Sequence, residues 1–257
     1  MNYWLNRIAK NQEKISDKTI KSINYQMQKY YGRAAERVIR DFEAVYLKIL
    51  NNVEDGKEPT PADLYKLDKY WQAQAQMRRE LEKLGNKQIK LLSAAFETNF
   101  FEVYYSLALP GEPLFNTVDT EAVKQLLNAV WVADGKQWSH RVWDNTERLA
   151  QTLNEELVHI VATGKKNSDL TKALQERFDV SYHRANTLVR TEVAHVQTEA
   201  AKQRYKDYGI EEVEVLVDED EKTCDICKAL VGKKWKVTDA PPLPAHPNER
   251  CCLVPVI

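Results

Sequence analysis

Residues 212–217, EVEVLV, decide how this chain is divided, because the spacing of its apolar residues changes there. Charged and apolar residues alternate in this stretch, and a period of two is typical of a half-buried strand. The segments 230–237, LVGKKWKV, with a turn at Gly232, and 252–257, CLVPVI, supply further candidate strands. Pro255 lacks a backbone N–H, so we expect the last strand to lie at a sheet edge. The sequence therefore predicts a small β module at the carboxyl end.

Before residue 212 the apolar residues recur at steps of three and four, which predicts helices. A second long helix is expected to begin at Thr60, an N-cap followed by Pro61, and to continue to Leu107 with a kink or an end at Gly85. The short connection to the preceding helix favours an antiparallel hairpin. The apolar stripe of the first helix consists of Ile20, Ile23, Met27, Tyr30, Ala34, Val38, Phe42, Val45 and Ile49.

Shorter helices are expected after residue 118, at 119–130, then up to Gly164, over 168–178, and from an N-cap at Ser181 to Gly209. The predicted fold is mainly α with a small C-terminal β module, an α+β arrangement. We expect a long helical hairpin over residues 1–113, a helical core over 114–210 and a zinc-ribbon-like tail over 211–257. Tryptophans 131, 138 and 143 are interpreted as core packing at a helix junction.

The net charge of the 257-residue chain is −1, but the charge is unevenly distributed. Residues 1–50 carry ten Lys or Arg against five Asp or Glu, whereas residues 211–221 carry seven acids. The basic segment is either a solvated helix face or a surface for DNA or an acidic partner. No apolar run is long enough for a membrane span, and no secretory signal is visible. We expect a protein made in a reducing cytoplasm, with no membrane partner.

Cysteine and histidine residues gather in the predicted β module. Cys224 and Cys227 form a Cys-x-x-Cys pair, and His246 and Cys251 follow about twenty residues later. Thiolates and imidazole are ligands that Zn²⁺ prefers, and one ion would stabilise a module with a small core. A redox pair, disulfides and plain reduced thiols remain alternatives. The predicted structural zinc site uses Cys224, Cys227, His246 and Cys251, with Glu249 and Cys252 as alternative ligands.

Two Glu-x-x-His pairs, Glu156 with His159 and Glu192 with His195, place a carboxylate and an imidazole on one helix face. Such pairs build di-iron bundles, but matching glutamates on the earlier helices are not evident. Chance recurrence in glutamate-rich helices is the better account. No catalytic residue is predicted, and an enzyme with a metal centre is the least favoured function.

From about Trp131 onward the order of motifs resembles the MuF-like family of phage minor head, or head-morphogenesis, proteins. The matching pieces are WVADGKQWSHRVW, the RTE of Arg190, Thr191 and Glu192, YKDYGIEEVE, DEKTCDICKALVGK, PPLPAHPNERC and LVP. Members often end in His-Pro-x-Cys-Arg-Cys, whereas here Glu249 replaces the first of those cysteines. We interpret Arg190 and Glu192 as a structural pair that docks the helix onto the β module.

The resemblance implies a minor capsid component that acts in procapsid assembly beside the portal and in DNA packaging or delivery. The implied partners are the portal protein, capsid and scaffold proteins, and DNA, which some members bind. The implied location is the virion, near the portal inside the capsid, and the host cytoplasm during assembly. Some relatives carry a toxin or transferase domain after this module, and since the sequence ends two residues past Pro255 we expect no enzymatic role. Non-specific DNA binding through the basic amino-terminal segment is the alternative function.

Overall fold

The computed structural model describes residues 3–52, 58–107, 118–217, 223–247, 249 and 251–256. The chain forms two compact units, of which the first comprises Met1–Asn24, Leu91–Trp138 and Thr187–Ile257, and the second Tyr25–Lys90 and Ser139–Asn186. Each unit is assembled from separate segments, because long helices contribute to both. The predicted domain boundaries at residues 113 and 210 stay a prediction.

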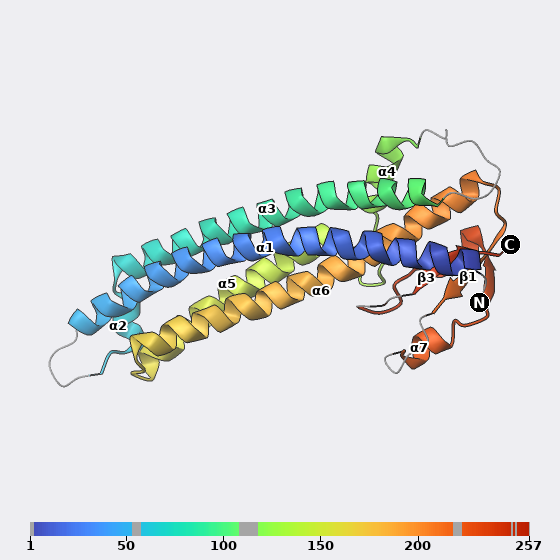
Figure 1. The fold of residues 1–257 in the computed structure, drawn as a ribbon. Coiled ribbons are helices and arrows are strands. Elements are labelled where there is room, and N and C mark those ends of the chain that lie inside the picture. The colour runs from blue at the N-terminus through green and yellow to red at the C-terminus, as the bar shows by residue number, and fades with distance from the viewer. Residues whose placement is uncertain are drawn as a thin grey trace. The chain divides into compact units, whose positions relative to one another are not determined.

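The described part of the chain is mainly helical, with one small antiparallel sheet near the carboxyl end, which confirms the predicted fold class (Figure 1). The helices are α1 (Tyr3–Asn52), α2 (Pro61–Tyr65), α3 (Asp68–Ser106), α4 (Thr120–Leu127), α5 (Trp138–Ala162), α6 (Asn167–Asp207), α7 (Asp225–Lys228) and the 3₁₀ turn η1 (Val237–Asp239). The strands are β1 (Glu212–Leu216), β2 (Lys234–Lys236) and β3 (Cys252–Pro255). Among the described helices, none combines the length and apolarity needed to cross a bilayer.

In the second unit α1 and α3 run antiparallel, as the sequence predicts. Arg37 Nη1 of α1 donates to Glu80 Oε2 of α3 at 2.7 Å, and the Tyr31 hydroxyl donates to Gln88 Oε1 at 3.4 Å. The predicted apolar stripe of α1 is buried, except that Tyr31 and not Tyr30 fills its position. Tyr31 is turned inward because its hydroxyl also reaches the Ser181 carbonyl of α6.

The start of the second hairpin helix is confirmed, but its course differs from the prediction. Thr60 and Asp63 form a capping box, with Pro61 in the first helical position. The helix stops at Tyr65, and α3 begins anew at Asp68. No break occurs at Gly85, where the Trp143 ring of α5 packs directly on the backbone. The glycine therefore serves close packing and does not end the helix.

The boundary between α5 and α6 is also partly predicted. Gly164, at φ +59°, ends α5, and the N–H groups of Gly164 and Lys165 donate to the carbonyls of Val161 and Ile160. The predicted start at Ser181 is wrong, because α6 runs unbroken through it. The Ser181 carbonyl instead accepts a 2.9 Å hydrogen bond from the Asn145 side chain of α5.

In the first unit the amino-terminal part of α1 lies beside the carboxyl-terminal part of α3. Lys18 forms a 2.7 Å ion pair with Glu102, and Asn99 Nδ2 donates to the Thr19 hydroxyl at 3.0 Å. The end of α6 belongs to the same unit, and Gly209, at φ +70°, follows two residues after the last helical residue, Asp207.

The sheet has the order β2-β1-β3, and both pairings are antiparallel. β1 alternates exposed and buried residues, as EVEVLV predicts, and β3 lies at the edge, as Pro255 predicts. The Tyr205 hydroxyl of α6 donates to the Leu253 carbonyl at 3.1 Å, so the sheet is anchored on that helix. The acidic residues 218–221 lie outside the described residues.

Candidate metal centre

The Cys-x-x-Cys pair lies at the start of α7, on a helical turn between β1 and β2. Cys224 is the N-cap, in extended conformation, and its Sγ accepts a hydrogen bond from the backbone N–H of Cys227 at 3.4 Å. One turn of helix brings residues three apart onto the same side. Both thiols therefore face the same space, and Cys227 is buried.

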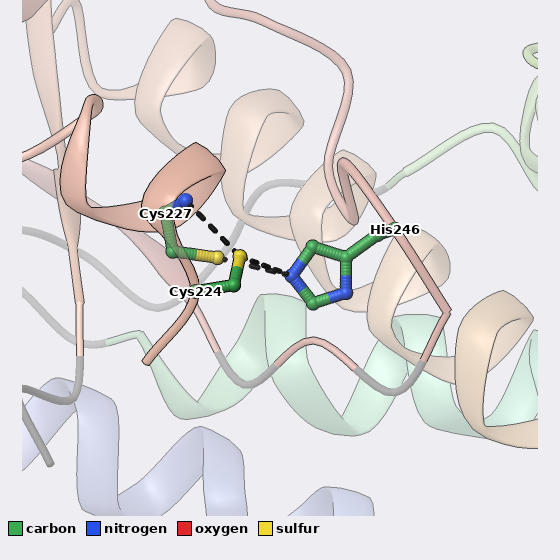
Figure 2. Close-up of side chains that lie close together, drawn as sticks. All are labelled: Cys224, Cys227 and His246. Carbon is green, nitrogen blue, oxygen red and sulfur yellow. Dashed lines mark hydrogen bonds between the residues drawn. The ribbon is translucent and has the colours of Figure 1, made fainter. Parts of the chain in front are cut away.

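His246 completes this group from a loop that precedes β3. Its Nε2 lies 3.0 Å from Cys224 Sγ and 3.2 Å from Cys227 Sγ (Figure 2). The other ring nitrogen, Nδ1, lies 3.0 Å from the Pro247 carbonyl, which can only accept, so Nδ1 carries a proton. Nε2 is thus the nitrogen available to a metal, oriented by a backbone partner as in many metal-bound histidines.

A second group of ligand atoms shares Cys227. The ligand atoms of Cys227, Glu249 and Cys251 all lie within 4.8 Å of one another, as do those of Cys224, Cys227 and His246. Glu249 Oε2 accepts the backbone N–H of Ala245 and, at 3.3 Å, that of His246. Its Oε1 is buried and makes no hydrogen bond. One carboxylate oxygen therefore shapes the loop, and the other is left for a cation.

The structure brings the predicted ligands together only in part. Cys224, Cys227 and His246 converge, whereas Cys251 joins the cluster through Cys227 and Glu249. The predicted alternative ligand Glu249 is a member of the second group. Cys252, the other alternative, begins β3 opposite Leu216 and belongs to neither group among the described residues.

The three clustered thiols differ in pKa because their surroundings differ. The backbone N–H of Cys227 lowers the pKa of Cys224, whereas burial raises the pKa of Cys227 to about 11. Burial and then the charge of Glu249 raise the pKa of Cys251 well above its usual range. The hydrogen bond from His246 to the Pro247 carbonyl is the main cause that raises the pKa of His246. A metal must displace protons from these groups, so its affinity falls as the pH decreases.

This donor set fits a structural zinc ion. Thiolate sulfur and imidazole nitrogen suit Zn²⁺, and a carboxylate oxygen is a third accepted ligand type. Bound there, the ion would supply charge neutralisation and a link between α7 and the loop before β3. The described cluster can therefore hold a metal through residues from two separate segments of the β module.

A cavity of about 260 Å³ adjoins the second group. Its walls come from the first turns of α1, from α6, from the end of β1 and from the loop before β3. Glu249, Cys251, Gln12 and Arg190 line it. Two of these lining residues have a buried side-chain atom without a hydrogen-bond partner, Gln12 at Nε2 and Glu249 at Oε1.

The RTE residues have separate roles in the structure. Glu192 is buried and accepts a 3.0 Å hydrogen bond from Trp131 Nε1, while Arg190 is exposed and lines the cavity. The Thr191 hydroxyl donates to the Thr187 carbonyl within α6. The predicted docking role of Arg190 and Glu192 stays a prediction, but the contact of Glu192 with Trp131 escaped the sequence reasoning.

His195 belongs to the same packing arrangement. Its ring stacks on Trp131, with centroids 4.1 Å apart and an interplanar angle of 10°, and its Nδ1 donates to the Leu243 carbonyl at 3.1 Å. Burial lowers the pKa of His195. The Glu192–His195 spacing was thus a real signal, since both side chains reach Trp131, but the chemistry is packing and not metal binding.

The other Glu-x-x-His pair lies in the second unit. Glu156 forms an ion pair with Arg177, and His159 lies 3.4 Å from the Lys165 ammonium. In the part of the chain that the structure describes, neither pair belongs to a group of three metal-ligating residues. Neither pair therefore has the further ligands that a di-iron site needs among the described residues.

Comparison with known proteins finds one family model that covers the cluster. The model of a family described as Phage Mu protein F like protein matches residues 151–253. The carboxyl-terminal part of the chain is therefore similar to this family. The matched region contains α6, β1, α7, β2 and the whole Cys/His/Glu cluster, and it confirms the predicted MuF-like resemblance for the carboxyl-terminal part of the chain. No curated protein and no solved structure gave a match to the chain.

Proposed function

We propose that this chain is a phage minor head protein that acts in head morphogenesis. The match of residues 151–253 to the Phage Mu protein F like family carries the proposal. Residues 1–24 and 91–138 form one compact unit with much of the matched region, so the helices outside the match and the matched module act together.

The finer proposal is a non-enzymatic role in procapsid assembly near the portal, and in packaging or delivery of the DNA. The partners are the portal protein and the capsid and scaffold proteins, and the location is the virion. Two observations support a structural role. Both Glu-x-x-His pairs are engaged in packing or ion pairs, and the candidate metal ligands come from two separate segments of the β module, whose described sheet has three strands.

We also propose that the metal is zinc and that it stabilises the β module. The buried sheet residues are few, and the described residues of the loop that carries His246 and Glu249 form no helix or strand. A bound ion links this loop to α7 and thereby fixes the position of the chain just before β3.

The assembly role is tested by co-expressing the tagged chain with the portal, scaffold and major capsid proteins of the phage that encodes it. We expect the full-length chain to sediment with procapsids in few copies. Cys224→Ser should reduce its incorporation because the β module loses a ligand of its stabilising metal ion. Cys252→Ser, which lies outside both ligand groups, should not. Equal yields of normal procapsids when the chain is omitted would refute the role.

A second candidate function, DNA binding, is favoured by a basic stripe on α1. Arg7, Lys10, Lys14, Lys18 and Lys21 are spaced by three or four residues and are all exposed. Such spacing places them along one helix face, where they can track a phosphate backbone. Lys18 is paired with Glu102, which leaves the other four as the main candidates for phosphate contacts.

A gel-shift titration over a range of salt concentrations tests this function. Each phosphate neutralised contributes about −0.9 to the slope of log affinity against log salt. Replacing Lys10, Lys14 and Lys21 by glutamine should flatten the slope by about 2 to 3 units. Replacing the three exposed lysines at 233, 234 and 236 serves as the matched control. If no protein–DNA complex forms at low salt, the chain does not bind DNA in this way.

A further inference from the structure

The C-terminal cluster has more ligand atoms than one tetrahedral ion can use. Five residues contribute, and their ligand atoms form two groups of three that share Cys227. Ligands around one zinc ion lie about 4 Å or less from one another, given metal–ligand distances of about 2.0–2.3 Å. The atoms of Cys224, Cys227, His246 and Cys251 do not all lie within 4.8 Å of one another, so these four do not form one such set.

Glu249 is the second observation that points to a ligand. Its side chain is only 8% exposed, and Oε1 makes no hydrogen bond although the carboxylate lies in the group with Cys227 and Cys251. A buried carboxylate oxygen without a partner is costly, because it has lost its hydrogen bonds to water and gained none in the protein. Arg190 lines the adjoining cavity, but no ion pair joins it to Glu249 among the described residues. A cation bound between Cys227, Glu249 and Cys251 satisfies this oxygen.

The charge of the cluster is compatible with two ions. Three thiolates and one carboxylate carry four negative charges when deprotonated, while His246 is neutral as a ligand. Two divalent ions balance these four charges.

We propose that the cluster binds two divalent metal ions bridged by the Cys227 thiolate. The first ion is held by Cys224, Cys227 and His246, and the second by Cys227, Glu249 and Cys251. Solvent completes the coordination of the second ion from the adjoining cavity, which Glu249 and Cys251 line. The inference rests on the proposed zinc ion that stabilises the β module, and that proposal requires only the first ion.

Metal stoichiometry of the full-length protein tests the inference. The chain is purified, dialysed against metal-free buffer and measured by elemental analysis and by native mass spectrometry, which separates bound from adventitious metal. We expect two zinc ions per chain in the wild type. Glu249→Gln and Cys251→Ser should each bind one, and Cys227→Ser should bind none because both ions lose the bridge.

Glu13→Gln is the matched control, because Glu13 lines the same cavity but belongs to neither ligand group. It should retain two ions. Glu249→Gln keeps an oxygen that can accept the N–H groups of Ala245 and His246, and far-UV circular dichroism checks that each variant folds. Titration with Co²⁺ gives a second readout, since thiolate-to-cobalt absorption should grow up to two equivalents in the wild type and up to one in Glu249→Gln.

The outcomes separate the two proposals. One ion in the wild type overturns the second site and leaves the proposal of a stabilising zinc ion intact. No ion overturns both. Two ions that persist in Glu249→Gln and Cys251→Ser show that the second ion lies elsewhere, which also overturns the assignment.

Discussion

Gly85 provides a sharp test of the packing in the second unit, because it lies in the middle of α3 against Trp143 of α5. A Cβ at this position would lie 2.8 Å from Cη2 of the Trp143 ring, closer than real Cβ contacts allow. Gly32, in the middle of α1, has nothing within 4 Å of the corresponding position. The two glycines are thus matched in helical context and differ in the space around them.

The expected effects of the two alanine substitutions have opposite signs. Glycine inside a helix is less favourable than alanine by about 1 kcal/mol, so Gly32→Ala should raise the free energy of unfolding by up to that amount. Gly85→Ala gains the same propensity but must displace a tryptophan ring, and overpacking costs about 1–3 kcal/mol. We therefore expect Gly85→Ala to be about 1–3 kcal/mol less stable than Gly32→Ala.

Urea unfolding followed by far-UV circular dichroism measures both values. A double-mutant cycle isolates the cause, because Trp143→Ala removes the ring that the new methyl group would meet. In that background Gly85→Ala should stabilise the protein much as Gly32→Ala does. If Gly85→Ala and Gly32→Ala have the same effect in the wild-type background, the packing of Trp143 on α3 is not as described.

Two further predictions concern the first unit. Cys224→Ser should abolish the stabilisation by zinc, which amounts to about 4 kcal/mol when free zinc is about 1,000-fold above Kd. A chelator should therefore lower the melting temperature of the wild type and of Cys252→Ser, but not that of Cys224→Ser. Equal shifts in all three proteins would contradict the site. Burial lowers the folded-state pKa of His195 from its ordinary 6.5, so the unfolded state binds more protons as the pH falls. The stability that depends on the neutral ring is present above pH 6.5 and is lost as the pH falls from 6.5 through the folded pKa. His195→Gln should show a shallower loss of stability in urea unfolding across that window, and an unchanged pH profile would count against burial of a neutral ring.

The sequence predicts the elements well where one local rule acts alone. The alternation in EVEVLV, the edge position of a strand with Pro255, and the cap formed by Thr60 and Asp63 each depend on neighbouring residues only. Helix continuity at Gly85 and Ser181 depends on tertiary packing instead. Trp143 fills the space that glycine leaves, and Asn145 and Tyr31 bind the Ser181 carbonyl, so two residues that often interrupt helices lie inside them.

The candidate site also depends partly on local rules and partly on tertiary packing. The spacing of Cys224 and Cys227 is enough to predict that their thiols lie together, because one helical turn orients both. The placement of His246, Glu249 and Cys251 depends on a loop whose described residues form no helix or strand, so their spacing in the sequence does not predict which side chains meet. The sequence offers Glu249 and Cys252 equally as alternative ligands, and only the burial and the unpaired oxygen of Glu249 distinguish the two.

X-ray absorption at the zinc edge tests the central claim most directly, because it identifies the atoms around the metal in the purified chain. A metal-stapled β module predicts sulfur neighbours at about 2.3 Å together with nitrogen or oxygen neighbours at about 2.0–2.2 Å. Zinc surrounded only by nitrogen and oxygen, or a chain that retains no zinc, would contradict the proposal that Cys224, Cys227 and His246 hold the ion.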